Sequence, residues 1–172
     1  MKQYVGLHDA SSSRDTLFAC PDDQFYYDWQ RGYVSQSHHD QQLFDYSSYT
    51  FNAINLAARP ARAPDGSTFQ SLPTPGIGGL TLSSIKNPSR TVMVAESPAF
   101  FPYSWHEPKP CQPGGIQPRG IALFNNAKNM VGFVDGHVAY IKIYWGNFVT
   151  NGGFMSCFYD PPANYDYQWS GS

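Results

Sequence analysis

The chain has 172 residues, a formal net charge of -2 and only 14% charged residues. This length suits one domain over residues 1–172, and the charge balance excludes the basic surface that binding to a nucleic-acid backbone requires. Aromatic residues make up 16% of the chain, and it contains 15 glycines and 14 prolines. Because this composition favours short strands and many turns, we expect a mainly β fold, an antiparallel sheet with long loops rich in proline and glycine and little helix.

The start of the chain and its cysteines narrow the class of protein further. No stretch approaches the roughly 18 to 20 apolar residues of a membrane span, and residues 1–15 lack the apolar core of a signal peptide. We therefore expect the chain itself to be soluble. Cys20, Cys111 and Cys157 are far apart and form no Cys-x-x-Cys pair. They predict neither a redox motif nor a thiol-only zinc site, and the sequence leaves open whether two of them are joined.

In chain order, the predicted strands are separated by two long surface excursions. Strand character occurs at residues 47–56 and in "TVMVAE" at residues 91–96, which follows a helical turn that Pro88 ends. The excursions are residues 57–79 and 98–120, where repeated prolines and glycines favour turns over a strand ladder. The last nine residues, "NYDYQWSGS", are polar and are expected to form a mobile end.

The most regular run is "NMVGFVDGHVAYIK" at residues 129–142. Asp135 and Gly136 between two apolar runs predict a β-hairpin with a two-residue type I′ loop, in which both residues take positive φ. Phe133 would then face Val138, and both faces of the hairpin would be largely apolar. A hairpin of that kind is covered on both sides, so the sequence predicts a central element of the core.

Four short motifs, in order along the chain, resemble the prepilin-type proteins described by the H-X9-DG motif. They are Cys-Pro-x-Asp, Ser-Tyr-x-x-Asn, Ile-x-x-Pro-Ser-x-Thr ending in Glu, and the segment around Asp-Gly-His-Val. The histidine of the last motif is replaced by Asn125, whose amide can still donate and accept hydrogen bonds in a turn. The matching residues are Cys20, Pro21, Asp23, Ser48, Tyr49, Asn52, Ile85, Pro88, Ser89, Thr91, Glu96, Asn126, Asp135, Gly136 and His137.

This resemblance spans residues 17–143 and leaves residues 144–172 as a C-terminal extension. It implies a pseudopilin-like head, an antiparallel sheet wrapped around an apolar N-terminal helix, so the fold class becomes α+β when that helix is counted. The implied function is a non-enzymatic assembly subunit of a bacterial type II secretion or type IV pilus system. Expected partners are other pilin-like subunits or secretion proteins, with self-association possible. The implied location is periplasmic or at the cell surface, with anchoring to the inner membrane through a helix absent from this sequence.

Residues that could carry chemistry receive mostly structural interpretations. Asp135, His137 and Glu96 are a weak candidate set for a metal or for acid–base work, but a turn explains Asp-Gly without it. No nucleophile motif is present, so we expect no enzyme. Two other histidine sites are weaker still. The first is His38, His39 and Asp40, whose adjacent side chains point in different directions on an extended chain. The second is His106 with Glu107, which lie in a proline-rich loop where exposure is expected.

Two further ligand classes remain open. Calcium is a minor possibility in the acidic loops, although the dense pattern of an EF-hand is missing. Its candidate ligands are Asp22, Asp23, Asp28, Asp160 and Asp166. The alternative function is an extracellular carbohydrate-binding module, because the aromatic clusters around Trp29 and Trp105 offer flat rings for stacking against sugars.

Overall fold

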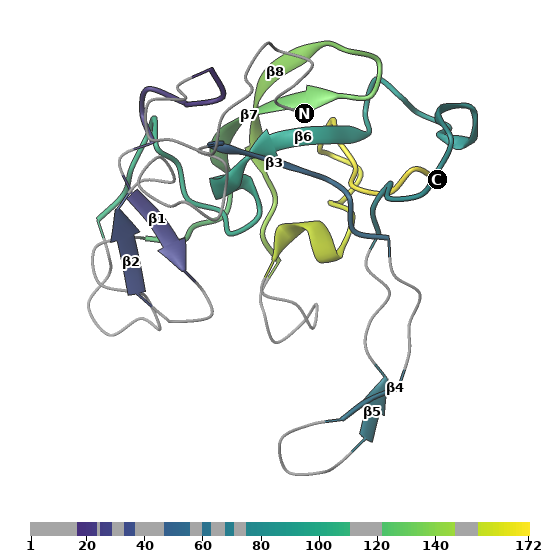
Figure 1. Cartoon of the computed structure of the whole chain (residues 1–172), viewed down its shortest axis with the longest axis horizontal. Coiled ribbons are helices and arrows are strands. Elements are labelled where there is room, and N and C mark those ends of the chain that lie inside the picture. The colour runs from purple at the N-terminus through teal and green to yellow at the C-terminus, as the bar shows by residue number, and fades with distance from the viewer. Residues whose placement is uncertain are drawn as a thin grey trace, which may run out of the picture.

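The computed structural model describes residues 17–23, 25–28, 33–36, 47–55, 60–62, 68–70, 75–110, 122–146 and 155–172. Its main element is a four-stranded antiparallel sheet in the order β3-β6-β7-β8 (Figure 1). The strands are β3 (Tyr49–Phe51), β6 (Val92–Glu96), β7 (Ala127–Phe133) and β8 (Val138–Ile143). The predicted mainly β, antiparallel fold with little helix is thus confirmed for the described residues.

Smaller elements surround this sheet. β1 (Phe25–Asp28) pairs with β2 (Tyr33–Gln36), and β4 (Pro60–Arg62) pairs with β5 (Thr68–Gln70). The β4–β5 ladder falls within the excursion predicted at residues 57–79 and stands away from the main sheet (Figure 1). Within the described residues there are three single-turn 3-10 helices, η4 (Leu82–Ser84), η5 (Ser97–Ala99) and η6 (Ser156–Phe158). No helix in the described part of the chain has the length and apolarity needed to cross a bilayer.

One face of the main sheet carries the core. Ala95 on β6 pairs with Val131 on β7, which pairs in turn with Ala139 on β8, so these side chains share one face. Ala95 and Val131 are buried. The segment after η5 packs here and supplies the large buried side chains Phe100, Tyr103 and Trp105. The second proline-rich excursion therefore begins inside the core and not on the surface.

The hairpin forms, but with a different turn from the one predicted. Gly132 pairs with Val138 and the Phe133 N–H donates to the His137 carbonyl, so pairing is shifted by one residue and the loop has three residues. The Gly136 N–H donates to the Phe133 carbonyl, as in a type I turn, and Gly136 alone of the loop residues takes positive φ, at 95°. This is the type I turn with a following left-handed glycine, for which only the last loop residue needs positive φ.

The expectation that both hairpin faces are covered is wrong. β7 lies inside the sheet, but β8 is an edge strand, and its burial alternates along the chain. Val138 on its outer face is 63% exposed. The sequence of β8 is largely apolar on both faces, and this pattern alone does not show whether both faces are buried or one face of an edge strand remains exposed to solvent.

The polar C-terminal end is not mobile, because it is bound to the sheet. The Val92 N–H donates to the Gln168 carbonyl, and the Gln168 N–H donates to the Arg90 carbonyl. The Asp160 carboxylate accepts hydrogen bonds from the backbone N–H groups of Trp169 and Ser170. Trp169 is fully buried in the core. One large aromatic side chain in a polar segment therefore outweighs the composition of its neighbours.

Replacing Trp169 by alanine is expected to lower the free energy of unfolding by about 3–5 kcal/mol, because it leaves a cavity in the core. Leu82→Ala is the matched control: that side chain is 72% exposed, so its truncation should change stability by no more than about 0.5 kcal/mol. Urea unfolding followed by circular dichroism measures both. Equal losses in the two variants would contradict the docking of the C-terminal segment.

Candidate functional site

The side chain of Glu96, the last residue of β6, is 0% exposed. A buried carboxylate is costly unless it is hydrogen-bonded and its charge is compensated. The last pair between β6 and β7 joins Ala95 and Val131. Beyond it the Glu96 carboxylate continues the contact, because Oε2 accepts a hydrogen bond from the Met130 N–H at 2.8 Å. The other oxygen, Oε1, lies 2.9 Å from Nε2 of His106.

The imidazole of His106 lies between two carboxylates. Its Nε2 faces Glu96, and its Nδ1 lies 2.5 Å from Oδ2 of Asp22. The ring meets the ring of Tyr140 edge-on with centroids 5.5 Å apart. The side chain of His106 is 26% exposed and that of Asp22 is 49% exposed. The buried end of the site thus reaches solvent through these two residues.

The loop that carries His106 is tied to the sheet next to the site. The Ser104 hydroxyl donates to the Lys128 carbonyl on β7 at 2.8 Å and accepts from the Glu107 N–H at 3.0 Å. The Lys128 ammonium lies 2.9 Å from the Glu107 carboxylate. Tyr103 and Trp105 are buried. His106 is therefore positioned by a loop whose two flanks are fixed by packing and by hydrogen bonds.

The thiol of Cys20 completes the site. Its sulfur lies 3.9 Å from Nε2 of His106. The Cys20 N–H donates to the Ser48 hydroxyl at 2.8 Å, and that hydroxyl donates to the Asp23 carboxylate at 2.8 Å. The Asp23 N–H donates back to the Cys20 carbonyl at 3.0 Å. This closed set of hydrogen bonds holds the Cys-Pro-Asp-Asp turn against the residue that precedes β3.

The electrostatics favour a protonated imidazole and a protonated thiol. Burial by itself lowers the pKa of His106, but the hydrogen bond and charge of Glu96, followed by those of Asp22, outweigh it, and the net pKa is raised above 6.5. Burial, with a further contribution from Glu96, raises the pKa of the Cys20 thiol to about 12. A thiol in that state is a poor nucleophile. The raised pKa of the Cys20 thiol therefore gives no support to a role for Cys20 as a nucleophile.

Residues from three of the four sequence motifs meet here. Cys20 and Asp23 come from the first motif and Ser48 from the second, and Tyr49, also from the second, pairs with Glu96 of the third in the sheet. The sequence suggested no link between Glu96 and the histidine ten residues after it. One feature of the sequence could have indicated such a partner. Glu96 ends an apolar strand, and a glutamate that is buried there needs a hydrogen-bonding or charged partner.

The predicted combination of Glu96 with Asp135 and His137 does not form. Asp135 and His137 pair with each other, with Oδ1 2.6 Å from Nδ1, and the imidazole stacks on the Phe133 ring at 4.2 Å. They lie beyond the end of β6 at which Val92 pairs with Phe133. Glu96 is at the other end, about 13 Å away at a rise of about 3.3 Å per residue. These two residues therefore belong to the exposed hairpin turn.

The remaining residues of the H-X9-DG segment lie at the opposite end of β7. The Asn125 side chain accepts a hydrogen bond from the Trp145 N–H at 2.8 Å, and Asn126 takes a positive φ of 64°. Asparagine tolerates that conformation better than most residues. The spacing of the motif thus corresponds to one strand with a turn at each end, so its residues shape the hairpin.

Other motif residues support the core. The Asn52 side chain donates to the carbonyls of Val92 and Trp169, at 2.8 and 2.7 Å. Ile85 is buried, whereas Pro21 and Ser89 are exposed. The Pro88 carbonyl accepts from the Asp135 N–H at 3.3 Å. These contacts connect the motifs through the fold.

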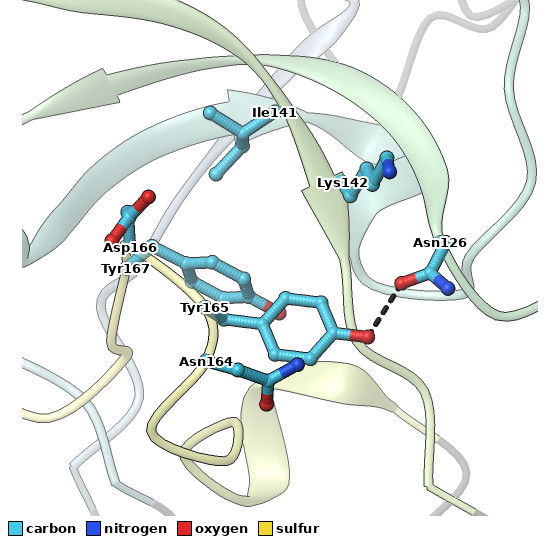
Figure 2. Close-up of a pocket in the computed structure, with 7 residues that line it drawn as sticks. All are labelled: Asn126, Ile141, Lys142, Asn164, Tyr165, Asp166 and Tyr167. Carbon is cyan, nitrogen blue, oxygen red and sulfur yellow. Dashed lines mark hydrogen bonds between the residues drawn. The ribbon is translucent and has the colours of Figure 1, made fainter.

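The calcium candidates whose side chains the structure describes do not gather in one place. Asp22 and Asp23 belong to the site above, Asp160 binds the C-terminal backbone, and Asp166 lines the pocket of Figure 2. Trp105 is buried, so it offers no stacking surface. The other candidates lie outside the residues, or the side chains, that the structure describes: Trp29, Asp28, His38, His39, Asp40 and Cys111.

A separate pocket of about 390 Å³ opens beside β8 (Figure 2). Its lining consists of Asn126, Ile141, Lys142, Asn164, Tyr165, Asp166 and Tyr167. The Tyr165 hydroxyl points to the Asn126 side chain and donates a hydrogen bond to its oxygen. The volume falls within the range of small-ligand sites, and the lining offers amide, ammonium and carboxylate groups around a tyrosine ring.

Comparison of this chain with protein-family models, with curated proteins and with solved structures finds no match.

The raised pKa of His106 makes stability depend on pH. A group whose pKa is higher in the folded than in the unfolded chain stabilises the fold fully below its unfolded value, near 6.5, and this contribution is lost as the pH rises through the folded value. The groups facing the imidazole are the carboxylates of Glu96 and Asp22, the Cys20 thiol and the Tyr140 ring.

We expect the stability difference between the wild type and His106→Gln to shrink above pH 6.5. Urea unfolding from pH 5 to 9 with EDTA measures it, and a difference independent of pH would contradict the proposed ion pairs.

Proposed function

We propose that this chain is the globular head of a pseudopilin-like subunit in a bacterial type II secretion or type IV pilus-type system, an assembly protein that works outside the cytoplasm. The observation that carries the proposal is a row of apolar residues across all four strands of the main sheet. Phe51 pairs with Val94, Val94 with Gly132, and Gly132 with Val138. We call these four residues the apolar row.

The apolar row lies on the face of the sheet opposite the core. It is on the same face as Glu96, because Val94 and Glu96 are two residues apart on β6. The Cys20 turn and His106 cover that face at Glu96, but Phe51 is 46% exposed and Val138 is 63% exposed. The site at Glu96 therefore closes one end of the face and leaves the two ends of the apolar row, Phe51 and Val138, accessible, whereas Val94 is half-buried and Gly132 is buried.

An apolar sheet face is stable in water only when another layer covers it. Gly132 contributes no side chain, and an added Cβ there would lie 2.9 Å from the Val94 side chain, so the row is flat in its centre. A flat apolar face of this kind suits a helix packed across the strands. Such a helix is what the resemblance to prepilin-type proteins implies for a pseudopilin subunit, whether it comes from the same subunit or from a neighbour.

Charged substitutions in the apolar row should abolish self-association of the isolated chain. We expect the wild type to sediment as a concentration-dependent mixture and Phe51→Asp/Val138→Asp to sediment as a monomer, because each carboxylate would be desolvated in the contact. The control Leu80→Asp/Leu82→Asp changes two exposed leucines outside the sheet and should behave as the wild type. A wild type that stays monomeric at all concentrations, or a control that also dissociates, would count against the proposal.

The identity of the partner is tested in cells that produce a pilus or a type II secretion system. A photo-crosslinking amino acid at position 51 should give adducts with a pilin-like subunit, identified by mass spectrometry, whereas the same group at position 82 should give none. Adducts only with unrelated envelope proteins would contradict the assembly function.

Carbohydrate binding is a second candidate function, favoured by the pocket beside β8 and not by Trp105. Tyr165 offers a ring there, and Asn126, Lys142 and Asp166 offer hydrogen-bonding groups for hydroxyls. On a glycan array, Tyr165→Ala should weaken binding about tenfold through loss of stacking, and Tyr165→Phe, which keeps the ring, should retain most of it. Absence of saturable binding by the wild type would dismiss this candidate.

A further inference from the structure

We propose that Cys20, Glu96 and His106 form a binding site for a divalent transition metal of the zinc class, with Asp22 positioning the imidazole from its other side. This inference does not depend on the assembly function. Among the described residues, ligand atoms of Cys20, Asp22 and His106 all lie within 4.8 Å of one another. The carboxylate of Glu96 faces the same imidazole nitrogen that the thiol approaches.

The two nitrogens of His106 have different surroundings, and this selects the metal-binding atom. Nδ1 lies against Asp22, and Nε2 faces both Glu96 Oε1 and the Cys20 sulfur. Histidine ligands commonly donate their other ring N–H to a carboxylate, which fixes the tautomer and orients the ring. Asp22 is placed for this role, so Nε2 is the atom that can bind a metal, once its proton has left, together with the thiol and Glu96.

The sulfur–nitrogen and nitrogen–oxygen distances suit a tetrahedral ion after small movements. Bond lengths of about 2.3 Å to sulfur and about 2.0 Å to nitrogen and oxygen place sulfur and nitrogen about 3.5 Å apart, and nitrogen and oxygen about 3.3 Å apart. The sulfur lies 3.9 Å from Nε2, and Oε1 of Glu96 lies 2.9 Å from it. The first separation therefore shortens and the second lengthens by about 0.4 Å each, which side-chain rotation can supply.

The charges also favour a cation at this position. Glu96 is fully buried and Asp22 is the second carboxylate on the imidazole. The lysine on the neighbouring strand, Lys128, is paired with Glu107. A dication between Nε2, Oε1 and the sulfur would take the place of the imidazolium charge in compensating the buried carboxylate. It would replace two protons, one on Nε2 of the imidazolium and one on the thiol, and both leave to solvent as the nitrogen–metal and sulfur–metal bonds form.

The backbone already holds the ligands in place. Oε2 of Glu96 is engaged by the Met130 N–H, which leaves Oε1 directed at the site. Cys20 is fixed through Ser48 and Asp23. The partial exposure of His106 and Asp22 gives solvent, and therefore an ion and a fourth water ligand, a route to the site. A metal site of this kind needs a preorganised ligand set and an entry path, and both are present.

Cobalt(II) titration of the reduced chain tests the proposal, because cobalt reports both coordination geometry and thiolate ligation. We expect one equivalent to produce the visible bands of four-coordinate cobalt and a thiolate-to-cobalt charge-transfer band, and one equivalent of zinc to remove both. Cys20→Ser should abolish the charge-transfer band, while Cys111→Ser and Cys157→Ser should keep it. His106→Gln should lose tight binding, and Asp22→Asn should weaken it by about 10- to 100-fold.

The Asp135–His137 pair provides the matched control. It has a carboxylate–imidazole contact of 2.6 Å like that of Asp22 with His106, but both of its side chains are exposed. His137→Gln should therefore leave the cobalt spectrum unchanged. If Cys20→Ser fails to fold, zinc-dependent thermal stabilisation decides: the wild type and His137→Gln should gain melting temperature with zinc, and Asp22→Asn should gain less. A wild type without cobalt bands, or bands that persist in Cys20→Ser, would overturn the proposal.

Discussion

The carboxylate of Glu96 is the constraint on which the surrounding structure depends. It is fully buried at the end of β6, where it accepts a hydrogen bond from Met130 on β7 and faces the imidazole of His106. A carboxylate without such partners would be strongly destabilising in this position. The Cys20 turn and the His106 loop together enclose the Glu96 side chain where the pairing of β6 with β7 ends, and the His106 imidazole compensates its charge.

This enclosure divides the outer face of the sheet into two parts. At the Glu96 end, the Cys20 turn, His106 and Tyr140 form a polar lid. Toward Phe51 and Val138, no described residue buries the face, and apolar side chains remain exposed. One face of one sheet thus offers two kinds of binding, a cluster of metal-ligand atoms and a surface for an apolar helix. The two are adjacent, because Val94 and Glu96 are neighbours on the same side of β6.

The elements that were predicted correctly are those decided by nearest neighbours in the chain. Asp135 and Gly136 place a turn between two strands, and the apolar run before Glu96 gives β6. The turn type was wrong because three-residue and two-residue loops share the Asp-Gly signal and differ only in pairing register. The prediction of a mobile C-terminal end was wrong because the average polarity of the segment does not show that the Trp169 side chain packs in the core against distant parts of the chain.

The candidate site was beyond sequence reasoning for a related reason. The sequence gives the residues of the site separate roles. Cys20 and Glu96 are motif positions, and Glu96 is also grouped with Asp135 and His137 as a weak metal or acid–base set. Asp22 is a candidate calcium ligand, and His106 is part of an exposed loop. The sequence by itself determined the strands, the hairpin and the mainly β class, because these depend on patterns repeated over a few residues. Only the tertiary structure decided which polar groups meet, because contacts between Cys20, Glu96 and His106 arise from strand order and loop packing, which sequence spacing does not encode.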